Sequence, residues 1–299
     1  YNKIDYNNLR KLISEGLPEE IPDLRSLLWK LFLNYYPNDL EEWEIFSKEK
    51  NEDYEKIKKD IIDENSKEKY KNLLYEITSD ITRTRTDMNF FNKNNKVNED
   101  EGILGDTLTR ILLIFAVLHP DISYIQGMNE ILGTIYYSFA KSNEINLESD
   151  LFYCFENFML EVKDIYLEGN DNKSKGINGI VKKIEEILEK YDPELFNHFE
   201  FLGIEINFFA LRWILIFFAQ EFFMPETLRL WDSLIIQSDK FKFVIYITIA
   251  ILYKKREELL SKDFSEVMFS LQNLKTLDVS IDEIILEANN IENKVEKGF

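Results

Sequence analysis

Two short polar stretches hold the residues of this chain whose types and spacing are best suited to chemistry. In the first, ITSDITRTRT (residues 77–86), Asp80 and Arg83 lie three positions apart, so on a helix they can pair across one turn. Such a pair fixes the direction of a long side chain, and Ile77 and Ile81 would anchor the same turn in the core. The spacing predicts an arginine that is oriented yet accessible to a partner's phosphate, although the stretch taken alone favours an ordinary surface arginine.

The second stretch, DISYIQGMNEILG (residues 121–133), places a glutamine in a turn before an apolar helix. Gly127 permits a tight backbone path. The amide of Gln126 both donates and accepts hydrogen bonds, so it can hold a water molecule or a backbone group. A polar capping turn, in which Gln126 and Asn129 satisfy the amides of a helix end, explains the same residues. Taken alone, this stretch leaves both interpretations open.

The composition argues against several classes of protein. The chain carries 55 Asp and Glu against 36 Lys and Arg, a formal net charge of −19, which disfavours a general nucleic-acid-binding role. The single cysteine, Cys154, cannot form an internal disulfide and favours a reducing compartment. We expect Cys154 to be buried and inert. With only His119 and His198 beside it, a Cys/His zinc site is disfavoured.

The small number of turn-forming residues predicts an all-α fold. Only ten Gly and six Pro punctuate the 299 residues, and apolar residues recur at helical spacing over roughly a dozen helices or more. Besides an apolar helix after Gly127, helices are expected near residues 1–15, 22–37, 39–76 with a break at 63–66, 106–118, 149–165, 180–191, 193–201, 205–222, 225–236, 240–260 and 264–273. Polar loops are expected at 92–102 and 168–178, the second between two lobes.

Two apolar runs are expected to be buried helices instead of membrane spans. FFALRWILIFFAQEFFM (208–224) is interrupted by Arg212, Gln220 and Glu221, and FVIYITIAILY (243–253) is too short to cross a bilayer. The second run has strand propensity as well, but its neighbours offer no partner strands. The polar start YNKIDYNNLRKL is not a secretory signal.

Together, the two polar stretches resemble a known family. ITSDITRT matches the IxxDxxRT motif, and SYIQGMN the YxQG motif, of TBC-domain Rab GTPase-activating proteins. GLPEEIPDLRSLLWKLFL (16–33) is similar to that family's opening segment, and FFALRWILIFFAQEFFMPETLRLWDSLI (208–235) to its RW…LP…RLWD segment. The resemblance runs in order over about residues 16–274, and the segments ITRTRTDMNFF, IQGMNEILG and RLWDSL look closest to the member-thirteen subgroup.

The resemblance implies a single two-lobed TBC domain, with lobes of about 1–165 and 166–299, that accelerates GTP hydrolysis on a Rab and so regulates vesicle traffic. The motif arginine falls on Arg83, which would neutralise charge on the γ-phosphate, and the motif glutamine on Gln126, which would orient the attacking water. Both would face a groove between the lobes. Asp80 would hold Arg83. The other supporting positions of the motifs are Thr84, Tyr124, Gly127 and Asn129.

The same resemblance assigns GTP and Mg²⁺ to the Rab, so we expect no cofactor or metal on this chain and no enzyme activity of the chain alone. We expect a cytoplasmic monomer that meets endomembranes only through its GTP-bound Rab and that binds no nucleic acid. The stretch RTRTDMNFF lacks the proline that many members carry after the motif. This difference leaves open that Arg85 shares or replaces the role of Arg83.

Other functions remain open at this point. A catalytically idle TBC domain that acts as a Rab effector or scaffold would bind a Rab without accelerating hydrolysis. A helical interaction protein such as an α-solenoid would bind no Rab, but no repeat is visible. A hydrolase with its own active site is disfavoured by the shortage of His and Cys. The remaining unusual residues are expected to be structural: Trp29, Trp213 and Trp231 in the core, Arg212 and Asp232 in ion pairs, His119 at a helix end and His198 on the surface.

Overall fold

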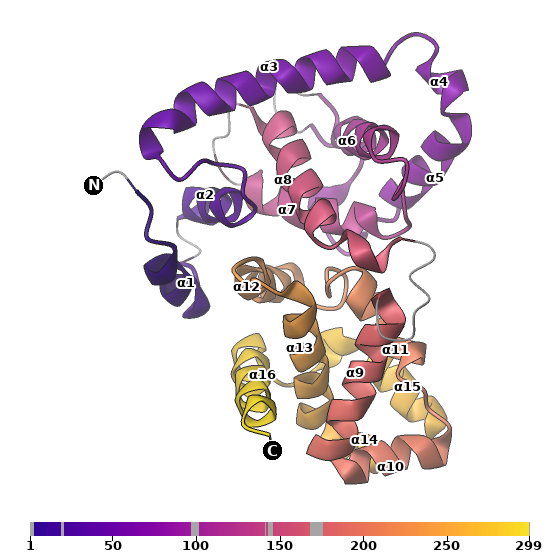
Figure 1. Cartoon of the computed structure of the whole chain (residues 1–299). Coiled ribbons are helices and arrows are strands. Elements are labelled where there is room, and N and C mark those ends of the chain that lie inside the picture. Colours follow the sequence, from indigo (N-terminus) through magenta and orange to yellow (C-terminus); the bar gives the residue numbers. More distant parts are fainter. Residues whose placement is uncertain are drawn as a thin grey trace. The chain divides into compact units, whose positions relative to one another are not determined.

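The computed structural model describes residues 3–18, 21–96, 102–140, 142, 146–167 and 176–298. In these residues, all regular secondary structure is helical, with sixteen α-helices, four short 3₁₀ helices and no strand beyond two isolated bridges. The all-α prediction is therefore confirmed. The chain forms two compact units, Tyr1–Lys163 and Asp164–Phe299, and each is described by itself (Figure 1).

The first unit is built around α6, α7 and α8, whose side chains are mostly buried. The long α3 crosses this core on one side, and α5 packs against α6 and α7 (Figure 1). Cys154 is enclosed in α8 and Trp29 in α2, as predicted. The helices of this unit are α1 Tyr6–Ser14, α2 Pro22–Phe32, α3 Trp43–Ile61, α4 Ser66–Lys69, α5 Lys71–Ile81, α6 Leu104–Leu118, α7 Met128–Phe139 and α8 Leu147–Glu161. Three 3₁₀ helices are η1 Leu40–Glu42, η2 Asn89–Phe91 and η3 Lys163–Ile165, the last spanning the boundary of the two units.

The second unit is centred on α13, which contacts α9, α11, α12, α14 and α16. Its β-branched run is helical, as predicted, and almost fully buried. Trp213 and Trp231 are also enclosed in this core. The helices are α9 Gly176–Tyr191, α10 Pro193–Leu202, α11 Asn207–Leu215, α12 Met224–Ile235, α13 Lys240–Lys254, α14 Arg256–Leu260, α15 Phe264–Gln272 and α16 Ile281–Glu296, with η4 at Leu274–Thr276.

Two predicted long helices are interrupted, so their predicted extents are wrong. The helix expected over 205–222 ends at Leu215, where Phe217 and Phe218 take positive φ angles of 50° and 59°. Burial of both rings and the hydrogen bond from the Trp231 indole to the Phe217 carbonyl, at 3.0 Å, hold this turn. The helix expected over 240–260 breaks at Lys255 into α13 and α14.

Helix α16 was missing from the sequence-based expectation, although its signals are local. Ser280 and Glu283 form a capping box at its start, each side chain bonding the other's backbone N–H. Behind the cap, Ile281, Ile284 and Ile285 begin a buried stripe at helical spacing.

Several smaller expectations have clear outcomes. The break predicted near residues 63–66 lies between α3 and α4, and the helix expected over 149–165 ends at Glu161. His198 is half-buried and not fully on the surface. Residues 97–101 and 168–175 of the two predicted loops lie outside the described residues. Within the described ranges, no helix is both long and apolar enough to cross a membrane.

Candidate functional site

Arg83 lies just beyond the end of α5, in a turn that the core holds from behind. Ile77 and Ile81 are buried, and the turn continues with an Arg83 N–H to Asp80 carbonyl hydrogen bond of 2.9 Å. The Arg83 side chain is 67% exposed, and its Nη2 donates to Asp80 Oδ1 at 2.9 Å. The guanidinium is thus tethered at one N–H group and open to solvent at the others.

The carboxylate of Asp80 connects this arginine to the segment before α7. It is almost buried, and its second oxygen, Oδ2, accepts a hydrogen bond from the Tyr124 hydroxyl at 2.8 Å. Burial raises the pKa of Tyr124 far above its usual value, and the hydrogen bond to Asp80 and the charge of that carboxylate raise it further. Tyr124 therefore keeps its proton and donates to Oδ2, which leaves Oδ1 for Arg83.

Asn129 and Thr84 close this connection into a ring. Asn129, in the first turn of α7, donates through Nδ2 to Thr84 Oγ1 at 2.9 Å and to the Asp80 carbonyl at 3.3 Å. Thr84 Oγ1 in turn donates to the Asp80 carbonyl at 3.2 Å. Because all of these groups are buried, their hydrogen bonds fix the end of α5 against the start of α7.

Gln126 occupies the exposed turn that leads into α7. Gly127 follows it at φ 105°, a left-handed conformation that glycine adopts without the strain other residues incur, and it serves as the N-cap of the helix. No hydrogen bond of the Gln126 side chain occurs within the described part of the chain. Its amide is therefore available to an external group.

The turn that carries Gln126 is also fixed at its other end, by His119. This residue caps α6, and its Nε2 donates to Glu156 Oε1 of α8 at 2.7 Å. The His119 carbonyl then accepts hydrogen bonds from the N–H groups of Ile122 and Ser123 at 3.1 and 2.7 Å. The helix-end position was predicted, but the hydrogen bond to α8 was not, because nothing in the local sequence indicates which residue of α8 lies opposite.

The two candidate residues face one hollow of about 290 Å³, formed entirely by the first unit. Arg83 supplies a fixed cation and Gln126 a free amide, a combination suited to an anion with a water molecule beside it. Tyr75, which sequence reasoning missed, lies at the edge of the same hollow. The full lining is Tyr75, Glu76, Ser79, Asp80, Arg83, Tyr124 and Gln126.

Arg85 does not belong to this hollow, which corrects the alternative that it shares the role of Arg83. Its side chain is fully enclosed, with Nε 3.4 Å from Asp87 Oδ1. Its backbone takes a positive φ of 41°. Placed in this way, Arg85 cannot reach a phosphate on another molecule, and its role is structural.

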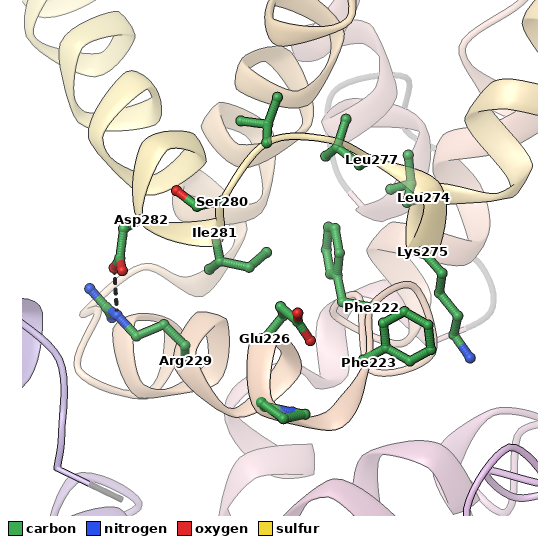
Figure 2. A pocket seen from close by; sticks show the side chains of 12 residues that line it. Phe222, Phe223, Glu226, Arg229, Leu274, Lys275, Leu277, Ser280, Ile281 and Asp282 are labelled. Atoms are coloured by element: carbon green, nitrogen blue, oxygen red, sulfur yellow. Dashed lines mark hydrogen bonds and ion pairs between the residues drawn. The ribbon is translucent and has the colours of Figure 1, made fainter.

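A second hollow of about 300 Å³ lies in the other unit, between the start of α12 and the segment from η4 to α16 (Figure 2). Its lining is mainly apolar, and Arg229 at its edge is paired with Asp282 at 2.8 Å. Lys275 lies over the exposed Phe223 ring, 5.6 Å from its centroid. Both cations of this hollow are thus held by neighbours, and the Ser280 side chain is engaged in the capping box of α16. Among the described residues, no group of three or more His, Cys, Asp or Glu could hold a metal ion.

Comparison with known proteins points to one family. The family model of the Rab-GTPase-TBC domain matches residues 22–260. TBC1 domain family member 13 of Homo sapiens is 36% identical over 192 residues, which are 63% of this chain and 48% of that protein. The GTPase-activating protein gyp1 of Schizosaccharomyces pombe is 24% identical over 303 residues, 94% of this chain and 56% of that protein. The chain thus spans about half the length of these curated relatives.

The fold comparison agrees with the family model. The crystal structure of the Ypt/Rab-GAP domain of Gyp1p matches 100% of this chain, and 95% of its own, with a TM-score of 0.85 at 24% sequence identity. At that identity the match shows a shared helical fold. The resemblance to the member-thirteen subgroup is likewise in keeping with the 36% identical relative.

Proposed function

The chain belongs to the Rab-GTPase-TBC domain family, and on this premise we propose that it accelerates GTP hydrolysis on a Rab-type small GTPase. In that role it would regulate vesicle traffic at the membranes that the Rab occupies. The proposal depends chiefly on one observation, that Arg83 and Gln126 come from separate elements and face the same accessible hollow. Two similar proteins, one named as a GTPase-activating protein and one as a Ypt/Rab-GAP domain, support it.

Arg83 would act on the charge of the transferred phosphoryl group. A guanidinium stays protonated and presents a planar fork of donors. One of its five N–H groups is used by Asp80, so the others remain for the γ-phosphate oxygens of a bound partner. An arginine supplied in this way accelerates hydrolysis by about 10³–10⁵-fold in other GTPases.

Gln126 would position the water that attacks the γ-phosphate. Its amide can accept a hydrogen bond from the water and donate one to a phosphate oxygen or to the partner's backbone. The rigid ends of its turn, at His119 and at Asn129, would limit where the amide can lie. In this proposal GTP and Mg²⁺ belong to the partner, and the chain contributes position and charge.

The test is single-turnover phosphate release from a panel of GTP-loaded Rabs. We expect the wild-type chain to accelerate at least one of them, and Arg83→Ala to lose about 10³–10⁵-fold of that acceleration. Arg83→Lys should fail as well, because an ammonium cannot make the forked contact. Gln126→Ala should also lose acceleration. Arg10→Ala, which removes an exposed arginine on α1, is the matched control and should keep full activity.

Two results would overturn the proposal. A folded Arg83→Ala variant with unchanged turnover would remove Arg83 from the mechanism. A wild-type chain that binds a GTP-loaded Rab in a pull-down yet accelerates none would be a Rab effector or scaffold without catalytic action.

A further inference from the structure

Tyr75 lies on α5, which ends at the turn that carries the proposed arginine finger. Tyr75 and Ser79 are four residues apart on α5, so their side chains lie one above the other, and Arg83 follows in the turn after the helix ends. All three line the hollow described above. The Tyr75 residue is 74% exposed, and no other large, strongly exposed apolar residue among those described lines this hollow.

This exposure is unusual for a large aromatic side chain beside a polar site. Aromatic rings supply most of their free energy when they are buried, and tyrosine is enriched among the few residues that dominate protein–protein interfaces. The neighbours of Tyr75 along the hollow, Glu76 and Ser79, are polar and cover little of the ring. The ring is thus available to a partner.

The distance along α5 indicates which part of a partner would meet the ring. From Tyr75 to the end of α5 the helix rises by about 9 Å, and Arg83 lies two residues beyond, so both lie within the width of a folded domain, whose radius of gyration is about 13 Å even at 100 residues. Gln126 must lie close to the attacking water and lines the same hollow. A nucleotide between Arg83 and Gln126 therefore brings the protein surface around its γ-phosphate over Tyr75.

We propose that Tyr75 is a docking contact that packs against the partner segments covering the γ-phosphate of GTP. The inference rests on the proposed function and adds a contact surface that would distinguish a GTP-loaded partner from a GDP-loaded one. In small GTPases such segments are ordered by the γ-phosphate and its Mg²⁺ and are released after hydrolysis. A ring that packs on them binds the GTP-loaded form more tightly than the GDP-loaded form.

The experiment measures the dissociation constant of each variant for one Rab loaded with a non-hydrolysable GTP analogue or with GDP, together with kcat and KM. We expect Tyr75→Ala to weaken binding of the GTP form by about 10- to 30-fold, as loss of an interface hot spot does. KM should rise correspondingly while kcat is unchanged, because Tyr75 touches no reacting atom. Tyr75→Phe should bind like the wild type, since the ring makes the contact.

Ile45→Ala is the matched control. Ile45 is 64% exposed and belongs to the first turn of α3. The start of α3 lies at the opposite end of the first unit from α5 (Figure 1). It should leave the dissociation constant and KM unchanged. All three variants should melt at the wild-type temperature, because substitutions at exposed positions change stability little.

The outcomes separate this inference from the proposed function. Unchanged binding of the GTP form by Tyr75→Ala would overturn the docking role, and equal weakening for GTP and GDP forms would overturn the reading of nucleotide state. A wild-type chain that binds the GTP form but does not accelerate hydrolysis would overturn the proposed function alone, since the binding comparison still decides the role of Tyr75. A wild-type chain that binds no Rab would overturn both.

Discussion

Replacing Asp80 by asparagine would separate the tether of Arg83 from the finger itself. In the structure, Oδ1 of Asp80 accepts from Arg83 and Oδ2 accepts from the Tyr124 hydroxyl, at 2.9 and 2.8 Å. An asparagine of the same shape has one oxygen and one NH₂ group. The oxygen can still accept a hydrogen bond from the buried Tyr124 hydroxyl. The NH₂ group then faces the guanidinium, and because both groups are donors, no hydrogen bond forms between them. Arg83 loses its tether, while the hydrogen bonds that join Asp80 to Tyr124 and Asn129 are largely kept.

The expected cost in stability is small. An ion pair with an arginine that is 67% exposed contributes a few tenths of a kcal/mol. The Tyr124 hydrogen bond changes from a charged to a neutral acceptor, which lowers its contribution by about 1 kcal/mol. In a protein of 299 residues, that corresponds to a fall in the melting temperature of about 2 °C. The variant should therefore remain folded under assay conditions.

The expected loss of acceleration follows from the rotamer freedom that the Arg83 side chain regains without its tether. Arginine carries about 2 kcal/mol of rotamer entropy, so reordering an untethered Arg83 in the transition state can cost at most about 30-fold. Removing the guanidinium altogether, as in Arg83→Ala, should cost about 10³–10⁵-fold. The two variants are thus separated by more than an order of magnitude.

A double-mutant cycle in the single-turnover assay checks the reasoning. Asp80→Asn should lower the acceleration in the wild-type background and have no further effect in the Arg83→Ala background, because the tether then holds nothing. An equal fold loss in both backgrounds would refute it, and would mean that Asp80 acts through Tyr124 on the glutamine turn instead.

Further substitutions at three places test packing and electrostatics around and beyond the site. Gly133→Ala would place a methyl group 3.1 Å from the Thr84 side chain, whose hydroxyl is held in the ring, so the melting temperature and the acceleration should both fall despite the better helix propensity of alanine. Asp150→Ala removes the carboxylate that pairs with the buried Lys30 at 2.5 Å and accepts from the buried Tyr35 hydroxyl, and it should cost about 3–5 kcal/mol in chemical denaturation. Lys30→Met combined with Asp150→Leu and Tyr35→Phe, which removes all three polar groups together, should cost much less. Burial would raise the pKa of Glu258, but hydrogen bonds from two lysines and a serine lower it to about 2, below the ordinary value of 4.5. Its contribution is therefore fully present above pH 4.5 and lost as the pH falls through 2, so the melting temperatures of the wild type and Glu258→Gln should differ at pH 7 and converge in acid.

The hydrogen bonds around Asp80 show most clearly how much of the site the sequence could predict. The pairing of Asp80 with Arg83 is local, and helical spacing alone predicts it. The bonds from Tyr124 and Asn129 to the end of α5 join residues 44 and 49 positions apart. No periodicity in a single sequence shows such a contact, and only the family resemblance grouped these residues in advance. The roles of Arg83 and Gln126 themselves stay predictions for the assays above.

The fold shows the same division between local and non-local signals. The all-α class and the helical state of the β-branched α13 follow from sparse turns and missing partner strands. The early end of α11 does not, since the positive φ angles of Phe217 and Phe218 are imposed by burial of both rings and by a hydrogen bond from Trp231, fourteen residues away. Helix α16 was predictable in principle, because Ser280 begins a capping box that the sequence displays.

The site combines a buried, hydrogen-bonded support around Asp80 with the exposed side chains of Arg83 and Gln126. This arrangement explains how an acidic chain can present a cation. Asp80 is almost buried, and the Tyr124 hydroxyl and the arginine together offset the cost of keeping its charge there. The guanidinium remains in solvent, so its own charge carries little desolvation penalty before a partner arrives. On docking, water would leave the hollow, and the interaction between Arg83 and a phosphate would strengthen as the local dielectric constant falls. The attraction between Arg83 and the phosphate would therefore become strong only in the complex. The net charge of −19 acts at longer range, where salt screens it.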